Sequence, residues 1–177
     1  RVATFAWNTA RHLELYFAVP CSGRVVHTLN IRLFPEQLVY IINHAEDRFL
    51  FVDALTLPLV EAIAPRLTTV EAYVMMSERE RMPASTTLPK LLCYEDLLEA
   101  AAPVYEWPVF DEKSASTICY TSGTTGNPKG VVYHHRGAAA NAISNVLEWD
   151  MPKHAVYLWT LPMFHCNGWC FPWTVAA

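Results

Sequence analysis

Short apolar segments alternate with helical segments through the first half of the chain, and this alternation limits the possible folds more than any other feature. The β-like segments are 2–7, 25–29, 49–52 and 70–76. The run at 49–52 is continuously apolar, which is typical of a strand buried on both faces. Strands separated by helices of about ten residues form right-handed βαβ units. The sequence therefore predicts an α/β fold with a mainly parallel sheet.

Capping residues place the helices within this alternation. Asn8 and Thr9 offer an N-cap for a helix that ends near Cys21, and Pro35 opens a helix that closes at Ala45. Further helices are expected at 57–64 and 94–102, with a surface connection at 77–90. A boundary at 103–112 would divide the domain into two parts, at about 1–102 and about 113–177.

Composition excludes several classes of function. Hydrophobic residues make up 53% of the 177 residues, enough for a sizeable core, and the net charge of −4 comes without any basic block that could follow a nucleic acid. The apolar stretches fall short of the ~20 residues that a transmembrane helix needs. The five cysteines are scattered, which suits a reducing compartment and favours a cytoplasmic location.

The segment that follows the β-like residues 116–120 carries the clearest chemical signal. It contains four hydroxyls, three glycines and one lysine within residues 121–130. Glycines let backbone N–H groups converge on an anion, hydroxyls add donors, and Lys129 adds a positive charge. The expected ligand is a polyphosphate, although an ordinary hairpin turn uses similar residues.

The position of Lys129 distinguishes this loop from a Walker A loop, in which the lysine follows the second glycine and precedes Ser or Thr. Here Pro128 precedes the lysine and Gly130 follows it. Residues 131–133 are β-like, and a helix is expected only from about Arg136. The loop is therefore predicted to join two strands, so that a helix dipole does not contribute to phosphate binding.

Residues 120–130 resemble the signature loop of the adenylate-forming (AMP-binding) superfamily, Tyr-Thr-Ser-Gly-Thr-Thr-Gly-x-Pro-Lys-Gly. This superfamily includes acyl-CoA synthetases, peptide-synthetase adenylation domains and luciferases. Residues 161–169 resemble the next motif of fatty-acyl-CoA and medium-chain acyl-CoA ligases, and residues 1–53, with Asn43-His-Ala-Glu-Asp47, resemble the start of their large N-terminal domain. The likeness implies part of that domain, in the acyl-CoA synthetase/luciferase-like fold.

The resemblance also implies the ligands. A carboxylic acid would be activated by ATP with Mg²⁺ and then transferred to coenzyme A. The β- and γ-phosphates would lie against Thr121, Ser122, Gly123, Thr124, Thr125, Gly126 and Lys129, and Thr121 would also contact the magnesium ion. His165 and Trp169 would line the acyl pocket. The catalytic residues are expected outside this chain, and a homodimer of the full-length enzyme is a further hypothesis.

Alternative interpretations remain for the histidines and tryptophans. His165 could be a general base, a structural residue at the pocket wall, or a zinc ligand with Cys166 and Cys170, but a zinc site normally has four donors. Trp169 could border the pocket or belong to the core. Residues next to each other on a strand point to opposite faces, so no catalytic role is expected for His134 and His135.

Other activities in the superfamily are also possible. Amino-acid-activating domains carry an acidic residue where His165 stands, which favours a carboxylic acid without an α-amino group, such as a medium-chain or long-chain fatty acid. Luciferase-type oxidation is a rarer alternative. The chain has no Tyr-Gly-x-Thr-Glu motif, starts without methionine and stops within an aromatic run, so we expect a piece of a longer ligase that is inactive by itself.

Overall fold

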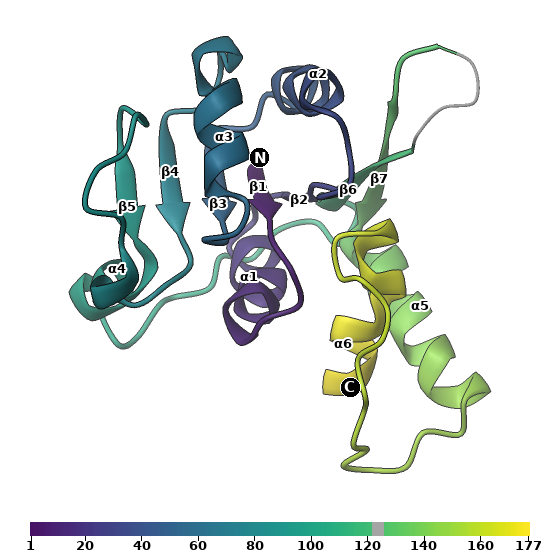
Figure 1. The fold of residues 1–177 in the computed structure, drawn as a ribbon. Helices are drawn as coiled ribbons and strands as arrows, with labels where there is room; N and C mark the ends of the chain where they lie inside the picture. Colours follow the sequence, from purple (N-terminus) through teal and green to yellow (C-terminus); the bar gives the residue numbers. More distant parts are fainter. Residues whose placement is uncertain (122–125) are drawn as a thin grey trace.

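The computed structural model describes residues 1–121 and 126–177, which form a seven-stranded sheet with helices on both faces (Figure 1). The strand order is β5-β4-β3-β1-β2-β6-β7. Neighbouring strands are parallel from β5 to β6, and the last pair, β6 and β7, is antiparallel. The predicted α/β class with a mainly parallel sheet is confirmed.

The elements have the following bounds. The strands are β1 (Val2–Phe5), β2 (Val26–Thr28), β3 (Phe49–Val52), β4 (Ala72–Met75), β5 (Leu91–Cys93), β6 (Ala115–Thr121) and β7 (Lys129–His134). The α-helices are α1 (Ala10–Cys21), α2 (Pro35–Ala45), α3 (Leu57–Ile63), α4 (Tyr94–Ala100), α5 (His135–Glu148) and α6 (Phe171–Ala176). Three short 3₁₀ segments are η1 (Ala64–Arg66), η2 (Arg79–Arg81) and η3 (Cys166–Cys170).

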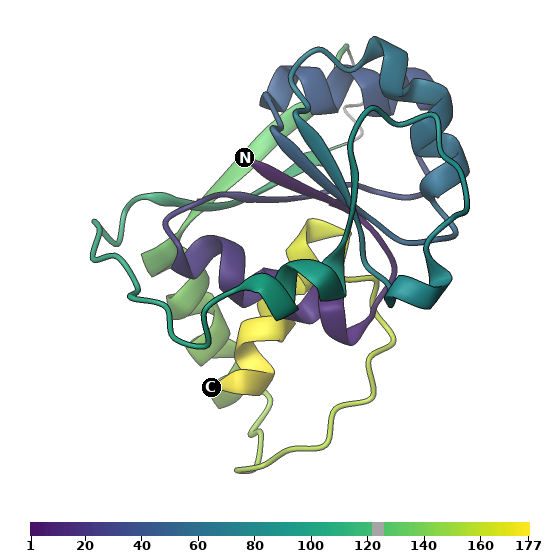
Figure 2. The ribbon, with the colours of Figure 1, turned by 90° about the vertical axis from the view of Figure 1, so that its left-hand side faces the viewer.

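The helices divide between the two faces of the sheet. Figure 2 shows α2 and α3 on one face and α1, α4, α5 and α6 on the other. The face under α2 and α3 carries the larger apolar cluster, which includes Leu38, Leu50 and Val60. On the opposite face, the indole N–H of Trp173 donates to the carbonyl of Tyr16 at 3.0 Å and links α6 to α1. The C-terminal helices are thereby held against the first helix.

Helix boundaries follow the predicted caps closely. The hydroxyl of Thr9 accepts a hydrogen bond from the backbone N–H of His12 at 3.2 Å, as an N-cap residue does. At the start of α2, the side chain of Gln37 accepts from the N–H of Phe34. This helix ends at Ala45 and is capped by Glu46, whose left-handed backbone (φ 56°) is a conformation that glycine adopts more easily.

Two elements were missed in the sequence. Strand β5 has only three residues and follows Pro89, and α6 lies within an aromatic run with Pro172 in its first turn, so neither shows a clear periodicity. The segment at 103–112 is exposed and irregular, as predicted. Because β6 pairs with β2, the parts before and after it share one sheet, and the division of the domain there remains a prediction. Among the described residues, no helix has both the length and the apolar composition needed to cross a bilayer.

Candidate functional site

The hydroxyl- and glycine-rich loop joins the two strands of an antiparallel hairpin. Thr121 at the end of β6 is paired with Lys129 at the start of β7, and Tyr120 is paired with Gly130. The prediction that the loop connects two strands is confirmed. Of the predicted phosphate ligands, Ser122, Gly123, Thr124 and Thr125 lie outside the described residues. Gly126 has a φ of 96°, which explains why this position needs glycine.

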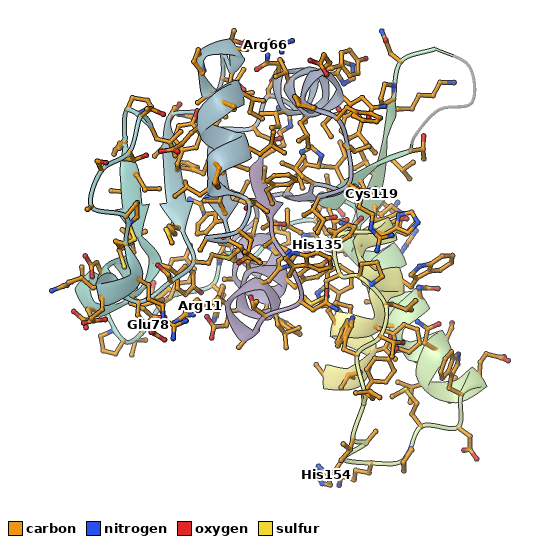
Figure 3. All side chains as sticks on the ribbon, viewed as in Figure 1. Arg11, Arg66, Glu78, Cys119, His135 and His154 are labelled. Atoms are coloured by element: carbon orange, nitrogen blue, oxygen red, sulfur yellow. The ribbon has the colours of Figure 1, made fainter. Side chains whose placement is uncertain are left out.

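The register of the hairpin places Thr121 and Lys129, two of the predicted phosphate ligands, on the same face. Residues paired across an antiparallel ladder point to the same side, and successive pairs alternate. Thr121 and Lys129 therefore lie on the same face as Cys119 and Val131. Tyr133, two residues beyond Val131 on β7, also lies on this face. The thiol of Cys119, labelled in Figure 3, lies 3.9 Å from the hydroxyl of Tyr133, in agreement with this assignment. Both Thr121 and Lys129 are exposed, as anion-binding groups must be.

A cavity of about 420 Å³ lies farther along the hairpin, where β7 meets α5 and η3. Tyr133 belongs to its wall and also to the face that carries Thr121 and Lys129. Gly137 and Ala138 of α5 also line the cavity. The remaining wall residues are Val132, His134, Asn141, Cys166, Trp169 and Cys170. A hydroxyl and an ammonium at the loop are thus followed, on one face of the hairpin, by a largely apolar pocket.

Burial keeps three of the side chains around this pocket in their neutral form. Burial raises the pKa of the Cys119 and Cys170 thiols, so that both stay protonated. Burial also raises the pKa of Tyr133 far above the usual value of a tyrosine. Within residues 1–121 and 126–177, no group of three or more His, Cys, Asp or Glu side chains is arranged to hold a metal ion. The pocket is therefore suited to an apolar group rather than to a charged one.

Polar contacts from distant parts of the chain fix the segment that carries His165 and Trp169. The side chain of Asn8 donates to the carbonyl of Leu161 at 2.8 Å and accepts from the N–H of Met163 at 2.7 Å. The hydroxyl of Tyr16 donates to the carbonyl of Met163. The side-chain amide of Asn167 is fully buried and donates to the hydroxyl of Thr28 at 3.0 Å. Residues from the β1–α1 connection, α1 and β2 thus position a motif that is more than a hundred residues away in the sequence.

The motif itself is neither a regular helix nor an open loop. All five residues of η3 have positive φ angles: Cys166 (46°), Asn167 (44°), Gly168 (60°), Trp169 (56°) and Cys170 (64°). Left-handed backbone costs a residue other than glycine about 1–2 kcal/mol. Strain of this kind persists where the surroundings over-determine the conformation, as the buried Asn167 does here.

The turn directs the two predicted pocket residues differently. Trp169 lines the cavity and is 55% exposed, so it is not part of the core. His165 is exposed and lies beside Cys166, outside the residues that line the cavity. His134, at the end of β7, has a local structural role, because its Nδ1 accepts a hydrogen bond from the N–H of Gly137 at 2.8 Å and caps α5. His135 packs against the ring of Phe110, with centroids 4.7 Å apart.

Several residues of this site were not identified from the sequence. Asn8 was interpreted only as a possible helix cap, and Asn167 was not singled out within the motif at 161–169. The pocket wall on α5, formed by Gly137, Ala138 and Asn141, was also missed.

Comparison with known proteins assigns the site to a family. A family model described as "AMP-binding enzyme" matches residues 1–177. The chain belongs to the AMP-binding enzyme family. This membership confirms the resemblance based on residues 120–130 and 161–169. The chain spans about a third of the length of the curated relatives that it matches.

The relatives are acyl-CoA ligases. The chain is 50% identical to a 3-methylmercaptopropionyl-CoA ligase from Ruegeria pomeroyi, with 99% of this chain and 33% of the relative covered. It is 44% identical to a medium-chain-fatty-acid–CoA ligase from Ectopseudomonas oleovorans, with 99% and 32% covered. Both relatives are therefore named as acyl-CoA ligases.

A solved structure shows the same fold. A putative long-chain-fatty-acid CoA ligase from Rhodopseudomonas palustris superposes with a TM-score of 0.83, at 22% identity and with 99% of this chain and 42% of that chain covered. The N-terminal domain of FACL13 from Mycobacterium tuberculosis gives a TM-score of 0.75 at 25% identity, with 99% and 41% covered. The predicted acyl-CoA synthetase type of N-terminal domain is thereby confirmed as the fold.

Proposed function

We propose that the full-length protein containing this chain is an AMP-forming acyl-CoA ligase. The observation that carries the proposal is the shared face of the hairpin, on which Thr121 and Lys129 are followed by Tyr133 at the wall of the apolar cavity. Groups that can hold phosphates and a pocket that can hold an acyl chain are thus aligned along one surface. The names of the related ligases support the same reaction.

In the proposed reaction, a carboxylate oxygen attacks the α-phosphorus of ATP and pyrophosphate leaves. The thiol of coenzyme A then attacks the acyl carbonyl, and AMP leaves. Lys129 would neutralise charge on the β- and γ-phosphates, with the loop residues 121–126 as hydrogen-bond donors. Mg²⁺ would neutralise further phosphate charge, with the hydroxyl of Thr121 as its protein contact. The contribution of this chain is to position ATP relative to the acid.

The proposed acid is a medium-chain or long-chain fatty acid or a related carboxylic acid. The cavity of about 420 Å³ is large enough for an apolar tail, and the neutral thiols around it do not repel one. Trp169 would border the tail, and His165 would lie at the entrance. A cytoplasmic location and a homodimer belong to the same proposal, and cell fractionation and the mass of the purified protein would test them.

Carboxylate-dependent exchange of pyrophosphate into ATP tests the proposal in the full-length protein. Lys129→Ala should reduce the exchange about ten- to a hundredfold, because a charge-assisted hydrogen bond contributes about 1.5–3 kcal/mol. Lys90→Ala is the matched control, since Lys90 is also exposed but lies beside β5 at the opposite edge of the sheet. Exchange that survives Lys129→Ala at the control level would refute the role of this lysine.

Product analysis separates this activity from the other activities of the superfamily. Formation of acyl-CoA supports the ligase, whereas aminoacyl or oxidised products would support an adenylation domain or a luciferase-like enzyme. The 177-residue chain by itself is expected to show no exchange.

A further inference from the structure

The face of the hairpin opposite Thr121 and Lys129 carries an aromatic contact with α2. Tyr120 and Gly130, the first and last residues of the loop motif, are paired there. A Cβ atom at position 130 would lie 2.8 Å from Cδ1 of Ile118, 3.1 Å from Cζ of Tyr120 and 3.2 Å from its Cε2, so that both side chains occupy the space beside the glycine. The tyrosine ring thus lies across the backbone of Gly130. The glycine leaves room for the ring, and the ring joins the two ends of the loop.

The hydroxyl of Tyr120 is held from α2. Its oxygen lies within hydrogen-bond distance of Nδ1 of His44, at 2.6 Å, and donates to that nitrogen in the tautomer that carries the proton on Nε2. The two rings meet edge to face with centroids 5.9 Å apart. Tyr40, one turn earlier on α2, stacks on His44 with centroids 5.2 Å apart and an interplanar angle of 20°. Figure 1 shows α2 above the sheet, near the strands of the hairpin. The last turn of α2 thereby reaches the base of the loop.

A buried histidine–aspartate pair packs behind the tyrosine ring. The ring of His27 lies 5.1 Å from that of Tyr120, and its Nδ1 is 2.6 Å from Oδ2 of Asp47. Both side chains of this pair are fully buried. Nε2 of His27 and Oδ1 of Asp47 have no hydrogen-bond partner among the described residues, which is a costly arrangement in a core. Packing alone does not require such a pair, and apolar residues of similar size would fill the same space.

We propose that Tyr120 is a positioning residue of the phosphate loop and that His44 is its tether. The inference rests on the proposed function, because it assigns the tether to ATP binding. The hydrogen bond fixes the ring, the ring fixes the pairing of residues 120 and 130, and this pairing sets the separation of the loop ends at Thr121 and Lys129. Burial raises the pKa of Tyr120 to about 12, so that its hydroxyl remains a donor at neutral pH.

Tyr120→Phe and His44→Leu each remove this hydrogen bond and leave an apolar side chain of similar size at the position. In the full-length protein, each should raise the KM for ATP in the exchange assay about three- to tenfold, the range expected for one neutral hydrogen bond. The kcat and the KM for the carboxylic acid should stay at the wild-type values, because a lost binding contact acts on the substrate that it positions. The double variant should be no worse than either single variant.

Two further variants separate positioning from general destabilisation. His44→Asn places an amide oxygen near the position of Nδ1 and should restore the wild-type KM for ATP. Tyr40→Phe removes a hydroxyl from the same cluster but keeps the ring against His44, and it should have no effect. Wild-type KM values in both Tyr120→Phe and His44→Leu would overturn the tether. Failure of His44→Asn to recover would overturn the role of the acceptor atom.

Amide hydrogen exchange of the peptide spanning residues 119–131 distinguishes the two proposals. Loss of the tether should speed exchange in this peptide whether or not the protein is a ligase. If the wild type exchanges no pyrophosphate with any acid but both variants show faster hydrogen exchange, the proposed function fails and only the anchoring of the loop stands. If the wild type is active and the variants exchange hydrogen at the wild-type rate, the tether fails and the proposed function stands.

Discussion

Protonation of His12 should destabilise the fold as the pH falls. This side chain lies between β1 and α1 and is fully buried. Its Nδ1 is 2.9 Å from the carbonyl of Trp7, which can only accept, and its Nε2 is 2.9 Å from the hydroxyl of Thr4. The neutral ring with a proton on Nδ1 satisfies both contacts, since Nε2 then accepts from Thr4. A second proton would place a charge in the core and remove this acceptor.

The magnitude follows from the pKa of His12. Burial lowers this pKa from 6.5 to about 4, although the hydrogen bond to Trp7 acts in the opposite direction. Between pH 6.5 and about 4, the unfolded chain binds a proton at His12 and the folded chain does not. The unfolding free energy is therefore highest above pH 6.5 and decreases as the pH falls toward about 4. The full difference corresponds to about 3 kcal/mol.

Denaturant unfolding of the wild type and of His12→Gln, followed by tryptophan fluorescence, tests this prediction. The carboxyl groups titrate in both proteins, so the difference between the two curves isolates the histidine. From pH 6.5 down to about 4, the wild type should lose about 3 kcal/mol more unfolding free energy than the variant. Parallel curves over this range would refute the reasoning, because they would mean that position 12 binds no proton on unfolding.

Three further predictions concern the strained positions and the pocket. Asn167→Ala should lower the unfolding free energy by about 1–3 kcal/mol in urea, because the hydroxyl of Thr28 loses a donor, and an unchanged midpoint would contradict the anchoring role. Glu46→Gly should be more stable than Glu46→Ala by about 1 kcal/mol, because both variants lose the same surface ion pair but only glycine adopts the left-handed backbone without strain. Equal melting temperatures of the two variants would contradict the strain at this position. Trp169→Ala should change the preference among acids of different length without changing the KM for ATP, and an identical acid profile would exclude Trp169 from the pocket.

Local sequence was sufficient for most of the secondary structure. The strands at β1 to β4 and the helices α1 to α4 lie within a few residues of their predicted positions, because their caps and apolar spacing act over one or two turns. The short β5 and α6 were not predictable in this way. Both are stabilised by the elements on which they pack, and their own residues show little periodicity.

The candidate site, too, was predicted only in part from the sequence. The phosphate loop was recognisable from residues 120–130 alone, because its chemistry depends on a contiguous set of glycines, hydroxyls and a lysine. The pocket was only partly recognisable, since Trp169 was predicted at its wall but the small residues of α5 were not. A cavity is the space between elements, and its shape depends on how closely they approach.

The sequence by itself determined the α/β class, the strand–loop–strand context of the phosphate loop and the family, because each is encoded in short contiguous patterns. Only the tertiary structure decided that Thr121 and Lys129 share a face with the pocket and that Tyr120 on the opposite face is held by His44. These relations depend on the register of β6 and β7 and on the packing of α2 against them. A shift of one residue in that register would reverse the faces, and no local pattern specifies it.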